Sequence, residues 1–226
     1  MVAEAIANPG RLAEDIEADG RRKPDKILEF FEIRPGMAVL DLFSGGGYYS
    51  EMLSHIVGDE GSVLAHNNQV YIDYTASTLA KRFTDGRLGN VQRITAEADT
   101  LELEAGSLDA VMMVLTYHDF YLVNPNFEWA EIDVPRLLVK FCLAMKPGAI
   151  LGVVDHEANA GSGISVATSL HRIESAYLKN ELTDSCFEFA GESDALRNPE
   201  DDHDQHMGAD GISGKTDRFV FKFKRK

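Results

Sequence analysis

Short apolar runs alternate along the chain with longer segments whose apolar residues recur every three or four positions. The short runs are typical of buried strands, and the longer pattern is typical of amphipathic helices. The predicted strands are 37–43, 62–66, 91–96, 108–115, 149–154, 186–190 and 219–223. Because strands and helices alternate, we expect an α/β fold in which helices cover both faces of a mostly parallel sheet.

Five segments carry the helical pattern, namely 24–31, 48–57, 71–83, 134–145 and about 165–182. Arg34-Pro35-Gly36 and Lys146-Pro147-Gly148 end two of them, because proline and glycine interrupt helices. The polar stretch at 198–214 separates the last two predicted strands. It is long for a connection, so it is either a functional flap or a mobile loop.

The composition indicates a soluble globular chain with an acidic surface. Its 37 Asp and Glu residues outnumber its 22 Lys and Arg residues, which gives a net charge of −15. Such a surface repels polyanions and lacks the basic footprint that nucleic-acid binding requires. The one concentrated basic run, at 222–226, is interpreted as a solvated chain end. Nucleic acid is therefore not expected as a partner.

The two cysteines, Cys142 and Cys186, are too few for a disulfide framework or a four-cysteine zinc site. Both lie in apolar surroundings, so we expect them to be small buried hydrophobic side chains. Residues 1–20 lack the continuous apolar core of a signal peptide, and no stretch approaches the roughly 20 apolar residues of a membrane span. The expected location is the cytoplasm, without membrane contact.

The sharpest motif is DLFSGGG at 41–47, which follows an apolar strand and opens a helix. Glycine lets the chain turn tightly and lets a ligand approach the backbone. The N-terminus of the helix offers free N–H groups to a carboxylate, and Asp41 can accept a hydrogen bond from an ammonium group. A nucleoside that carries an amino acid fits such a site.

Two other glycine motifs do not match this turn. A dinucleotide-binding turn needs G-x-G-x-x-G, but after Gly45 and Gly47 the third position is Ser50. A P-loop needs Gly-Lys-Ser or Gly-Lys-Thr, and neither follows. The remaining pattern is acid-x-x-x-Gly-x-Gly. A glycine-rich turn between a strand and a helix can also be a tight turn that binds no ligand, and this is the alternative interpretation.

The turn resembles motif I of the class I S-adenosylmethionine-dependent methyltransferases, whose usual form is acid-x-Gly-x-Gly-x-Gly. Asp41, Gly45 and Gly47 match this form, and Phe43 stands at the first glycine. IRPGMAVLDL, LDAVMMVLTYHD and LAMKPGAILGVVDH are also similar to that class, so the resemblance covers about 25–155. The last third, with LRNP and GKTDRFVFKF, is similar to a group of bacterial predicted methyltransferases without an assigned substrate.

The resemblance implies a sheet of seven strands, the last of them antiparallel, and S-adenosylmethionine as the cofactor. It implies one domain over 1–226, which consists of a helical cap (1–35), a cofactor-binding core (36–155) and a substrate-side helix with the C-terminal strands (156–226). The residues that the resemblance assigns to the cofactor are Asp41, Ser44, Gly45, Gly46, Gly47, Asn67, Asp99 and Thr116.

Two of these assignments have weaker support. The class usually has Asp or Glu where this chain has Asn67, at the end of the second strand, and there the acid holds both ribose hydroxyls. An amide makes weaker hydrogen bonds than a carboxylate. Asp99 is explained equally well as a surface acid or a helix cap.

Ionisable residues follow the fourth and fifth predicted strands. Because ligands of open α/β sheets bind beyond the carboxyl ends of the strands, we expect these groups to converge on one cleft. Methyl transfer to a hydroxyl or ammonium group needs a positioned nucleophile and a proton acceptor, a role that suits histidine. We predict His118 as this base, His156 as the second candidate, and Asp119 or Asp155 as the orienting partner. The alternative for each of these residues is a structural hydrogen bond at a strand end, without a catalytic role.

A metal ion is the alternative for the same residues. His118, Asp119, Asp155 and His156 are competent ligands, and the loop at 201–206 is rich in Asp and His. However, Mg²⁺ prefers oxygen ligands, and a zinc site requires side chains that converge. We therefore expect no required metal.

The acceptor follows from elimination. Thr116-Tyr117-His118-Asp119 differs from the Asn- or Asp-Pro-Pro-Tyr of amino methyltransferases that act on nucleobases or glutamine, and neither cysteine follows a proline, as cytosine-C5 enzymes require. A small-molecule acceptor remains. Two other functions stay open. Phe43 and Asn67 leave room for a non-catalytic S-adenosylmethionine-binding protein, whereas the glycine spacing opposes a nicotinamide-dependent oxidoreductase.

Overall fold

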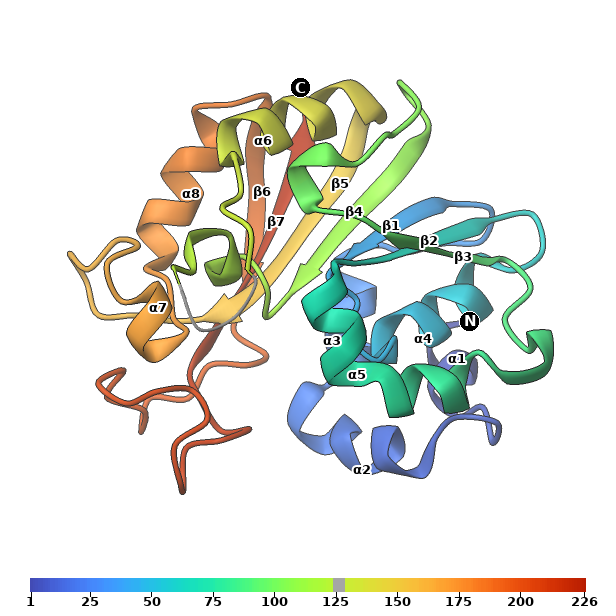
Figure 1. The fold of residues 1–226 in the computed structure, drawn as a ribbon, viewed down its shortest axis with the longest axis horizontal. Coiled ribbons are helices and arrows are strands. Elements are labelled where there is room, and N and C mark those ends of the chain that lie inside the picture. Colours follow the sequence, from blue (N-terminus) through green and yellow to red (C-terminus); the bar gives the residue numbers. More distant parts are fainter. Residues whose placement is uncertain (124–128) are drawn as a thin grey trace.

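The computed structural model describes residues 1–123 and 129–226. One seven-stranded sheet runs through the molecule in the order β3-β2-β1-β4-β5-β7-β6 (Figure 1). The strands are β1 (Ala38–Leu42), β2 (Ser62–Asn67), β3 (Val91–Thr95), β4 (Leu108–Val114), β5 (Met145–His156), β6 (Phe187–Ser193) and β7 (Arg218–Arg225). The helices are α1 (Val2–Ile6), α2 (Ala13–Arg22), α3 (Pro24–Phe30), α4 (Tyr48–Val57), α5 (Gln69–Arg82), α6 (Val134–Ala144), α7 (Ala167–Leu170) and α8 (Ser175–Thr183).

The sheet has the expected direction of strands. β1 pairs in parallel with β2 and β4, and the parallel pairing continues to β3 and β5. β7 pairs antiparallel with both β5 and β6. The expected fold class, a mostly parallel sheet with an antiparallel last strand, is therefore confirmed.

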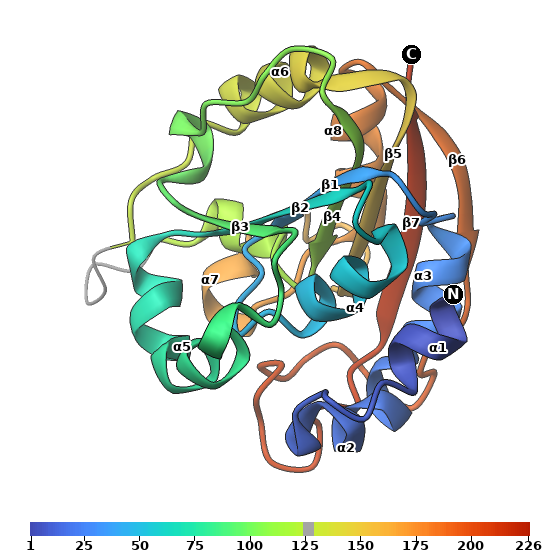
Figure 2. The same cartoon turned by 90° about the vertical axis from the view of Figure 1, so that its right-hand side faces the viewer.

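Helices cover both faces of the sheet. Along β1, Val39 belongs to the core that α1 to α4 share, whereas Leu40 and Leu42 belong to the core that contains α6 and α8. Figure 2 shows α6 on one side of the strands and α1, α3 and α4 on the other. Central strands buried on both faces explain why their sequences are apolar at successive positions rather than alternating.

The apolar patterns located most elements correctly. All seven predicted strands are present, although β5 begins at Met145, before the predicted start. The predicted helices at 24–31, 48–57, 71–83 and 134–145 correspond to α3, α4, α5 and α6. Within the described ranges, no helix combines the length and apolar character that crossing a bilayer demands.

The prediction of one helix over 165–182 is wrong. α7 ends at Leu170 and α8 begins at Ser175. Between them His171 adopts a left-handed conformation with φ 50°, which ends the helix. Arg172 follows, and its fully buried guanidinium pairs with Asp201 at 2.8 Å. The break matters because it turns His171 toward the cleft described below.

The expectation of two separate buried cysteines is also wrong, because both are half-buried and bonded to each other. Cys142 of α6 and Cys186, which precedes β6, form a disulfide. Each was expected to be a separate hydrophobic side chain, because 44 residues separate them and the sequence does not show that α6 ends beside β6. Disulfides persist mainly in oxidising compartments, so this bond argues against a permanently reducing environment.

Candidate active site

The glycine turn joins β1 to α4 through three residues in left-handed conformations. Gly45 and Gly47 have φ values of 57° and 80°, and Phe43 has φ 50°. Glycine adopts this region freely, whereas it costs a residue such as Phe43 about 1–2 kcal/mol. The Phe43 ring stacks on Tyr71 with centroids 5.1 Å apart and also contacts Trp129. Phe43, at the position of the class's first glycine, thus forms an aromatic wall between the turn and α5.

The glycines of the turn differ in what faces them. A Cβ at Gly46 would lie 2.7 Å from Cγ2 of Thr78, and one at Gly47 would lie 2.8 Å from Cδ of Arg82. These two positions are glycine because α5 packs directly on the turn. A Cβ at Gly45 would meet only Thr75 and Tyr71, at 4.0 Å. Gly45 is therefore the position of the three with free space for a ligand in front of it.

Two asparagines at the end of β2 have different roles. Asn67 accepts a hydrogen bond from the Gly45 amide at 2.9 Å, and its Nδ2 donates to the Gly45 carbonyl at 3.0 Å and to Ser44 Oγ at 3.2 Å. Its side chain is therefore engaged in holding the turn. Asn68 accepts from the Tyr71 amide and so caps α5, while its buried Nδ2 has no partner among the described residues.

Asp41 lies behind the turn. Its carboxylate is buried and accepts a hydrogen bond from Ser50 Oγ at 2.6 Å. Burial raises the pKa of the carboxyl to about 6, although the hydrogen bonds from Ser50 oppose the rise. Asp41 thus joins the end of β1 to α4.

A cavity of about 680 Å³ opens at the carboxyl end of β4. α5, the segment after β4, α7 and the loop before β7 all contribute to its walls. The described lining residues are Gln69, Val70, Tyr71, Asp73, Tyr74, Leu115, His118, Asp119, Leu122, Trp129, Thr168, His171 and Met207. The wall is mostly apolar and aromatic, and His118, Asp119 and His171 form an ionisable cluster within it.

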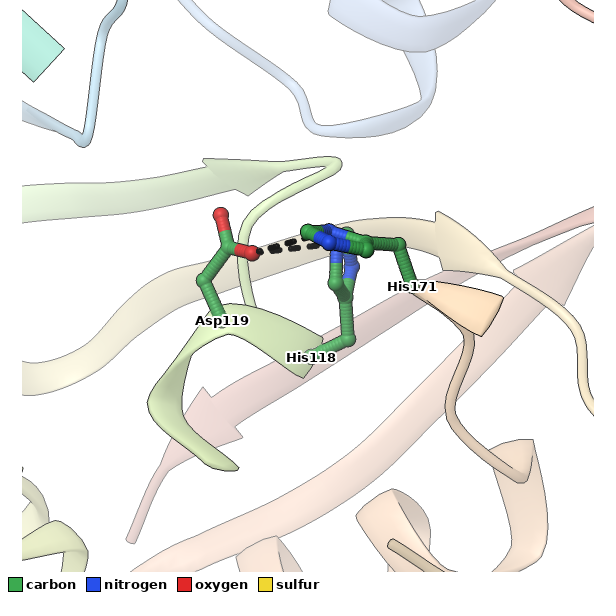
Figure 3. A group of neighbouring side chains, drawn as sticks. All are labelled: His118, Asp119 and His171. Atoms are coloured by element: carbon green, nitrogen blue, oxygen red, sulfur yellow. Dashed lines mark ion pairs between the residues drawn. The ribbon is translucent and has the colours of Figure 1, made fainter. Parts of the chain in front are cut away.

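The ionisable cluster centres on one carboxylate oxygen. Nε2 of His118 lies 3.1 Å from Oδ1 of Asp119, and Nδ1 of His171 lies 3.6 Å from the same oxygen (Figure 3). The Tyr71 hydroxyl donates to the other oxygen, Oδ2, at 2.5 Å. Behind the cluster, Nδ1 of His118 lies 2.7 Å from Oδ1 of Asp155, which is fully buried.

The two carboxylates determine the charge of His118. Burial by itself lowers the pKa of the imidazole, but the charges of Asp155 and Asp119 outweigh burial and raise that pKa to about 10. Burial alone would raise the pKa of Asp119, but the charge of His118 holds it well below its usual range. Both ring nitrogens of His118 face carboxylates, so neither is free to accept a proton from a substrate.

The other predicted residues lie at or after the ends of β3, β4 and β5. Thr116 is buried at the end of β4, and its Oγ1 has no partner among the described residues. Asp99 is half-buried in a short 3₁₀ helix, Ala98–Thr100, after β3. His156 is 5% exposed, its Nδ1 lies 2.7 Å from Thr216 Oγ1, and it is not among the described residues that line the cavity.

Sequence reasoning missed Tyr71 as a site residue, and it named His171 only as one of several ionisable groups, with Arg172 and Glu174, that could converge on the cleft. Tyr71 reaches Asp119 across 48 positions of sequence, and it looked like an ordinary residue at the start of a helix. His171 was assigned to the interior of a helix that the structure breaks. The only available signal for either was chemical, namely an ionisable side chain in a segment that follows a strand end.

The residues around the turn fit S-adenosylmethionine, the cofactor that the resemblance implies. Gly45 leaves space for a ligand. Two buried polar atoms that lack a partner among the described residues, Asn68 Nδ2 and Thr116 Oγ1, stand at the ends of β2 and β4, the two neighbours of β1. Buried polar atoms without partners are rare in native structures and often mark a ligand or ordered water. Gly45, the N-terminus of α4, Asn68 and Thr116 are therefore the features that would hold this cofactor.

Known proteins share parts of this sequence. Residues 23–99 match the family model of protein-L-isoaspartate(D-aspartate) O-methyltransferase. A relative from Teredinibacter turnerae, a ubiquinone/menaquinone biosynthesis C-methyltransferase, is 28% identical over 173 residues, which cover 75% of this chain and 64% of that protein. A relative from Shewanella woodyi with the same description is 38% identical over 129 residues, which cover 57% of this chain and 46% of that protein. The chain thus spans about half to two thirds of the length of these relatives.

The fold is also similar to that of a solved methyltransferase. A crystal structure of an S-adenosylmethionine-dependent methyltransferase from Aquifex aeolicus has a TM-score of 0.62 and 21% identity, and it covers 90% of this chain and 89% of that one. Strand order, glycine turn and sequence similarity agree with one another. The chain therefore has the fold of the class I S-adenosylmethionine-dependent methyltransferases and is similar to members of that class in sequence.

Proposed function

We propose that this chain transfers a methyl group from S-adenosylmethionine to a small-molecule acceptor bound in the cavity beside β4. The observation that supports this function best is the position of the ionisable cluster. His118, Asp119 and His171 line a mostly apolar cavity that begins at the end of β4, next to the strand that carries the glycine turn. A cavity of about 680 Å³ is in the range that encloses small ligands.

The cofactor supplies a methyl group that is already activated by its sulfonium. The protein therefore has to bind, orient and exclude water rather than activate the donor. The N-terminus of α4 provides N–H groups for a carboxylate. Within the turn, the amides of Ser44, Gly45 and Gly47 already donate to acceptors of the protein itself. We expect Asn68, Thr116 and Asp99 to contact the rest of the cofactor, while Asn67 and Asp41 hold the turn in shape.

The acceptor would lie against the rings of Tyr71 and Trp129 in the cavity lining, with its reacting atom toward the ionisable cluster. We propose His118 and Asp119 as the catalytic pair. Because both ring nitrogens of His118 face carboxylates, this pair is suited to orienting the acceptor rather than to removing its proton. His156, which lies behind the cavity wall, is proposed as a positioning residue for the strand end.

The acceptor class has partial support from relatives. The curated relatives are named for C-methylation in ubiquinone and menaquinone biosynthesis, which is a small-molecule reaction. A net charge of −15 opposes a polyanionic acceptor. The cytoplasmic location stays a prediction, and the Cys142–Cys186 disulfide argues against it.

Calorimetric titration with S-adenosylmethionine tests the cofactor half of the proposal. Gly45→Ala should weaken binding strongly, because its Cβ enters the ligand space. Gly36→Ala is the matched control, since Gly36 is also left-handed, with φ 79°, and has nothing within 4 Å of its Cβ. Equal affinity in the two variants, or no saturable binding by the wild type, would overturn the site assignment.

Transfer from methyl-labelled S-adenosylmethionine tests the acceptor half. The purified chain is incubated with the ultrafiltered small-molecule fraction of a cell extract, and in parallel with the protein and nucleic-acid fractions. Label is expected in the small-molecule fraction and should be lost in Asp119→Asn. Label only in a polymer fraction would contradict the proposed acceptor class, and no label from a protein that binds the cofactor would favour the non-catalytic alternative.

A further inference from the structure

We propose that His118, Asp119 and His171 form a binding site for one divalent transition-metal ion, with Zn²⁺ as the first candidate. Each side chain offers one ligand atom, and these atoms lie within 4.8 Å of one another. In tetrahedral zinc sites, ligand atoms about 2.0–2.1 Å from the metal are about 3.3 Å apart. The two separations from Asp119 Oδ1, 3.1 Å to His118 and 3.6 Å to His171, lie on either side of that value (Figure 3).

Outer contacts already orient the ligands. Metal-binding histidines usually donate their second ring N–H to a carboxylate or carbonyl, which leaves the other nitrogen for the metal. His118 has this arrangement, because its Nδ1 lies 2.7 Å from Asp155 Oδ1 and its backbone N–H donates to Asp155 Oδ2 at 2.8 Å. Tyr71 donates to Oδ2 of Asp119, which leaves Oδ1 directed toward the two histidines.

His171 is the ligand that the fold has to bring in from a distance. It follows α7 in a left-handed conformation with φ 50°, and the next residue, Arg172, is anchored by its buried pair with Asp201. The Ile173 amide donates to the carbonyl of His156, which ties the same segment to the end of β5. These contacts fix His171 opposite Asp119 without using its ring.

The donor set selects the kind of ion. Two imidazole nitrogens and one carboxylate oxygen suit Zn²⁺ and neighbouring transition metals, whereas Mg²⁺ and Ca²⁺ prefer sets of oxygens. Three protein ligands leave a coordination position open in a tetrahedral site. Because all three side chains line the cavity, that position opens toward it. Metal binding here does not depend on whether the chain transfers a methyl group.

The alternative without a metal is a proton shared between His118 and Asp119. To distinguish a bound metal ion from a shared proton, the full chain is purified without a histidine tag and stripped of metal with a chelator. It is then titrated with Zn²⁺ by calorimetry, and bound metal is counted by elemental analysis. We expect one Zn²⁺ per chain. Co²⁺ at the same site should give visible absorption bands, and an equal concentration of Mg²⁺ should not compete.

Matched variants localise the ion. His171→Asn and Asp119→Asn should each weaken Zn²⁺ binding by more than about 100-fold, since even residues that only support ligands contribute about 10–100-fold. Asparagine tolerates the left-handed backbone at 171. His203→Asn is the control, because His203 is also left-handed, with φ 64°, and its Nε2 lies 3.1 Å from Asp217, but it does not line the cavity. Thermal unfolding confirms that each variant is folded.

No stoichiometric Zn²⁺ in the wild type, or equal Zn²⁺ affinity in His171→Asn and the wild type, would overturn the proposal. Titrating the metal-free protein with S-adenosylmethionine keeps the two proposals apart. If the chain binds the cofactor but no Zn²⁺, only the proposed metal site is overturned. If it binds Zn²⁺ but no cofactor, only the proposed function is overturned.

Discussion

The two sides of the cleft balance their charges in different ways. Beside the glycine turn, the fully buried Arg82 pairs with Glu51 and Asp15, and its Nε donates to the carbonyl of Gly46. Beside β4, the ion pairs of Asp119 and Asp155 within the described residues are with histidine rings alone. Arginine keeps its charge at any accessible pH, whereas an imidazole is charged only after it takes up a proton.

The difference in charge balance indicates that one side of the cleft maintains the structure and the other binds ligands. The turn that would hold the cofactor is fixed by permanent charges and does not need a ligand to be complete. The cluster at the acceptor cavity is balanced only when something positive joins it, whether a proton or a metal ion. We therefore expect variants on the turn side to change stability most, and variants on the β4 side to change binding most.

The largest expected effect is on the turn side. Arg82→Leu leaves the buried Asp15 without its ion-pair partner and leaves Glu51 with Arg87 alone, and breaking a buried pair in this way costs about 3–5 kcal/mol. Urea unfolding measures the loss. Lys81→Ala is the control, because the neighbouring Lys81 pairs with Glu14 in an exposed position, where such pairs contribute about 0–1 kcal/mol. Equal losses in both variants would show that the Arg82 network does not hold the turn.

The next effect concerns the disulfide, which lies away from both sides of the cleft. Closing a loop of 44 residues is expected to contribute about 3–4 kcal/mol, mainly by restricting the unfolded chain. Cys142→Ser should lower the free energy of unfolding by about this amount and leave ligand binding to the folded chain unchanged. A reductant should lower the melting temperature of the wild type and have no further effect on the variant. A wild type insensitive to reductant would show that the bond is not formed.

The sequence was sufficient where local patterns decide the structure. Short apolar runs, continuous in the central strands and alternating in the last one, placed the seven strands. The DLFSGGG turn pointed to the class, because tight strand–helix turns have few sequence solutions. It failed where distant residues decide. The break at His171 depends on the pairing of Arg172 with Asp201, and the disulfide depends on the end of α6 lying beside β6. Neither relation leaves a local pattern.

The site was predicted in part for the same reason. His118 and Asp119 follow a strand end, where open sheets bind ligands, so their position was foreseeable. Their charges were not, because the state of His118 depends on Asp155, which lies 37 positions later. Asn67 shows the limit of resemblance, since it occupies the position of a cofactor contact in the class and is engaged here with the turn.

Asp41 sharpens the comparison, because it is a buried carboxylate on the turn side whose direct partner is the neutral Ser50. Its pKa of about 6 in the folded chain lies above the ordinary value near 4, so folding favours its protonated form. Ionisation of Asp41 therefore does not lower the free energy of unfolding below about pH 4. Above about pH 6 it lowers that free energy by its full amount, up to about 3 kcal/mol. The stability of the wild type relative to Asp41→Asn should therefore fall as the pH rises through this window.

Unfolding in urea at several pH values measures this difference. Ser50→Ala is the informative second variant, because it removes a hydrogen bond that lowers the pKa of Asp41 and should steepen the decline. A stability difference between wild type and Asp41→Asn that is constant from about pH 4 to pH 7 would show that the carboxyl titrates normally.

The smallest expected effect is that of Asn67→Asp, for which the family pattern and the geometry of this chain predict opposite changes in S-adenosylmethionine binding. By the family pattern, Asn67→Asp restores the usual acid and should tighten S-adenosylmethionine binding. By the geometry it should weaken binding, because Nδ2 of Asn67 donates to the Gly45 carbonyl at 3.0 Å and to Ser44 Oγ at 3.2 Å, and a carboxylate would face that carbonyl without a proton. We expect a stability loss of about 1–2 kcal/mol and an affinity loss of up to about tenfold.

Asn68→Asp is the matched control one residue further along. It keeps the oxygen that caps α5 through the Tyr71 amide and loses only the Nδ2 that has no partner among the described residues. We expect unchanged stability and equal or tighter cofactor binding, since a carboxylate then stands at the end of β2 with no carbonyl to repel it. If Asn67→Asp binds the cofactor more tightly than Asn68→Asp does, residue 67 contacts the ribose as in the class, and its hydrogen bonds to the turn are secondary.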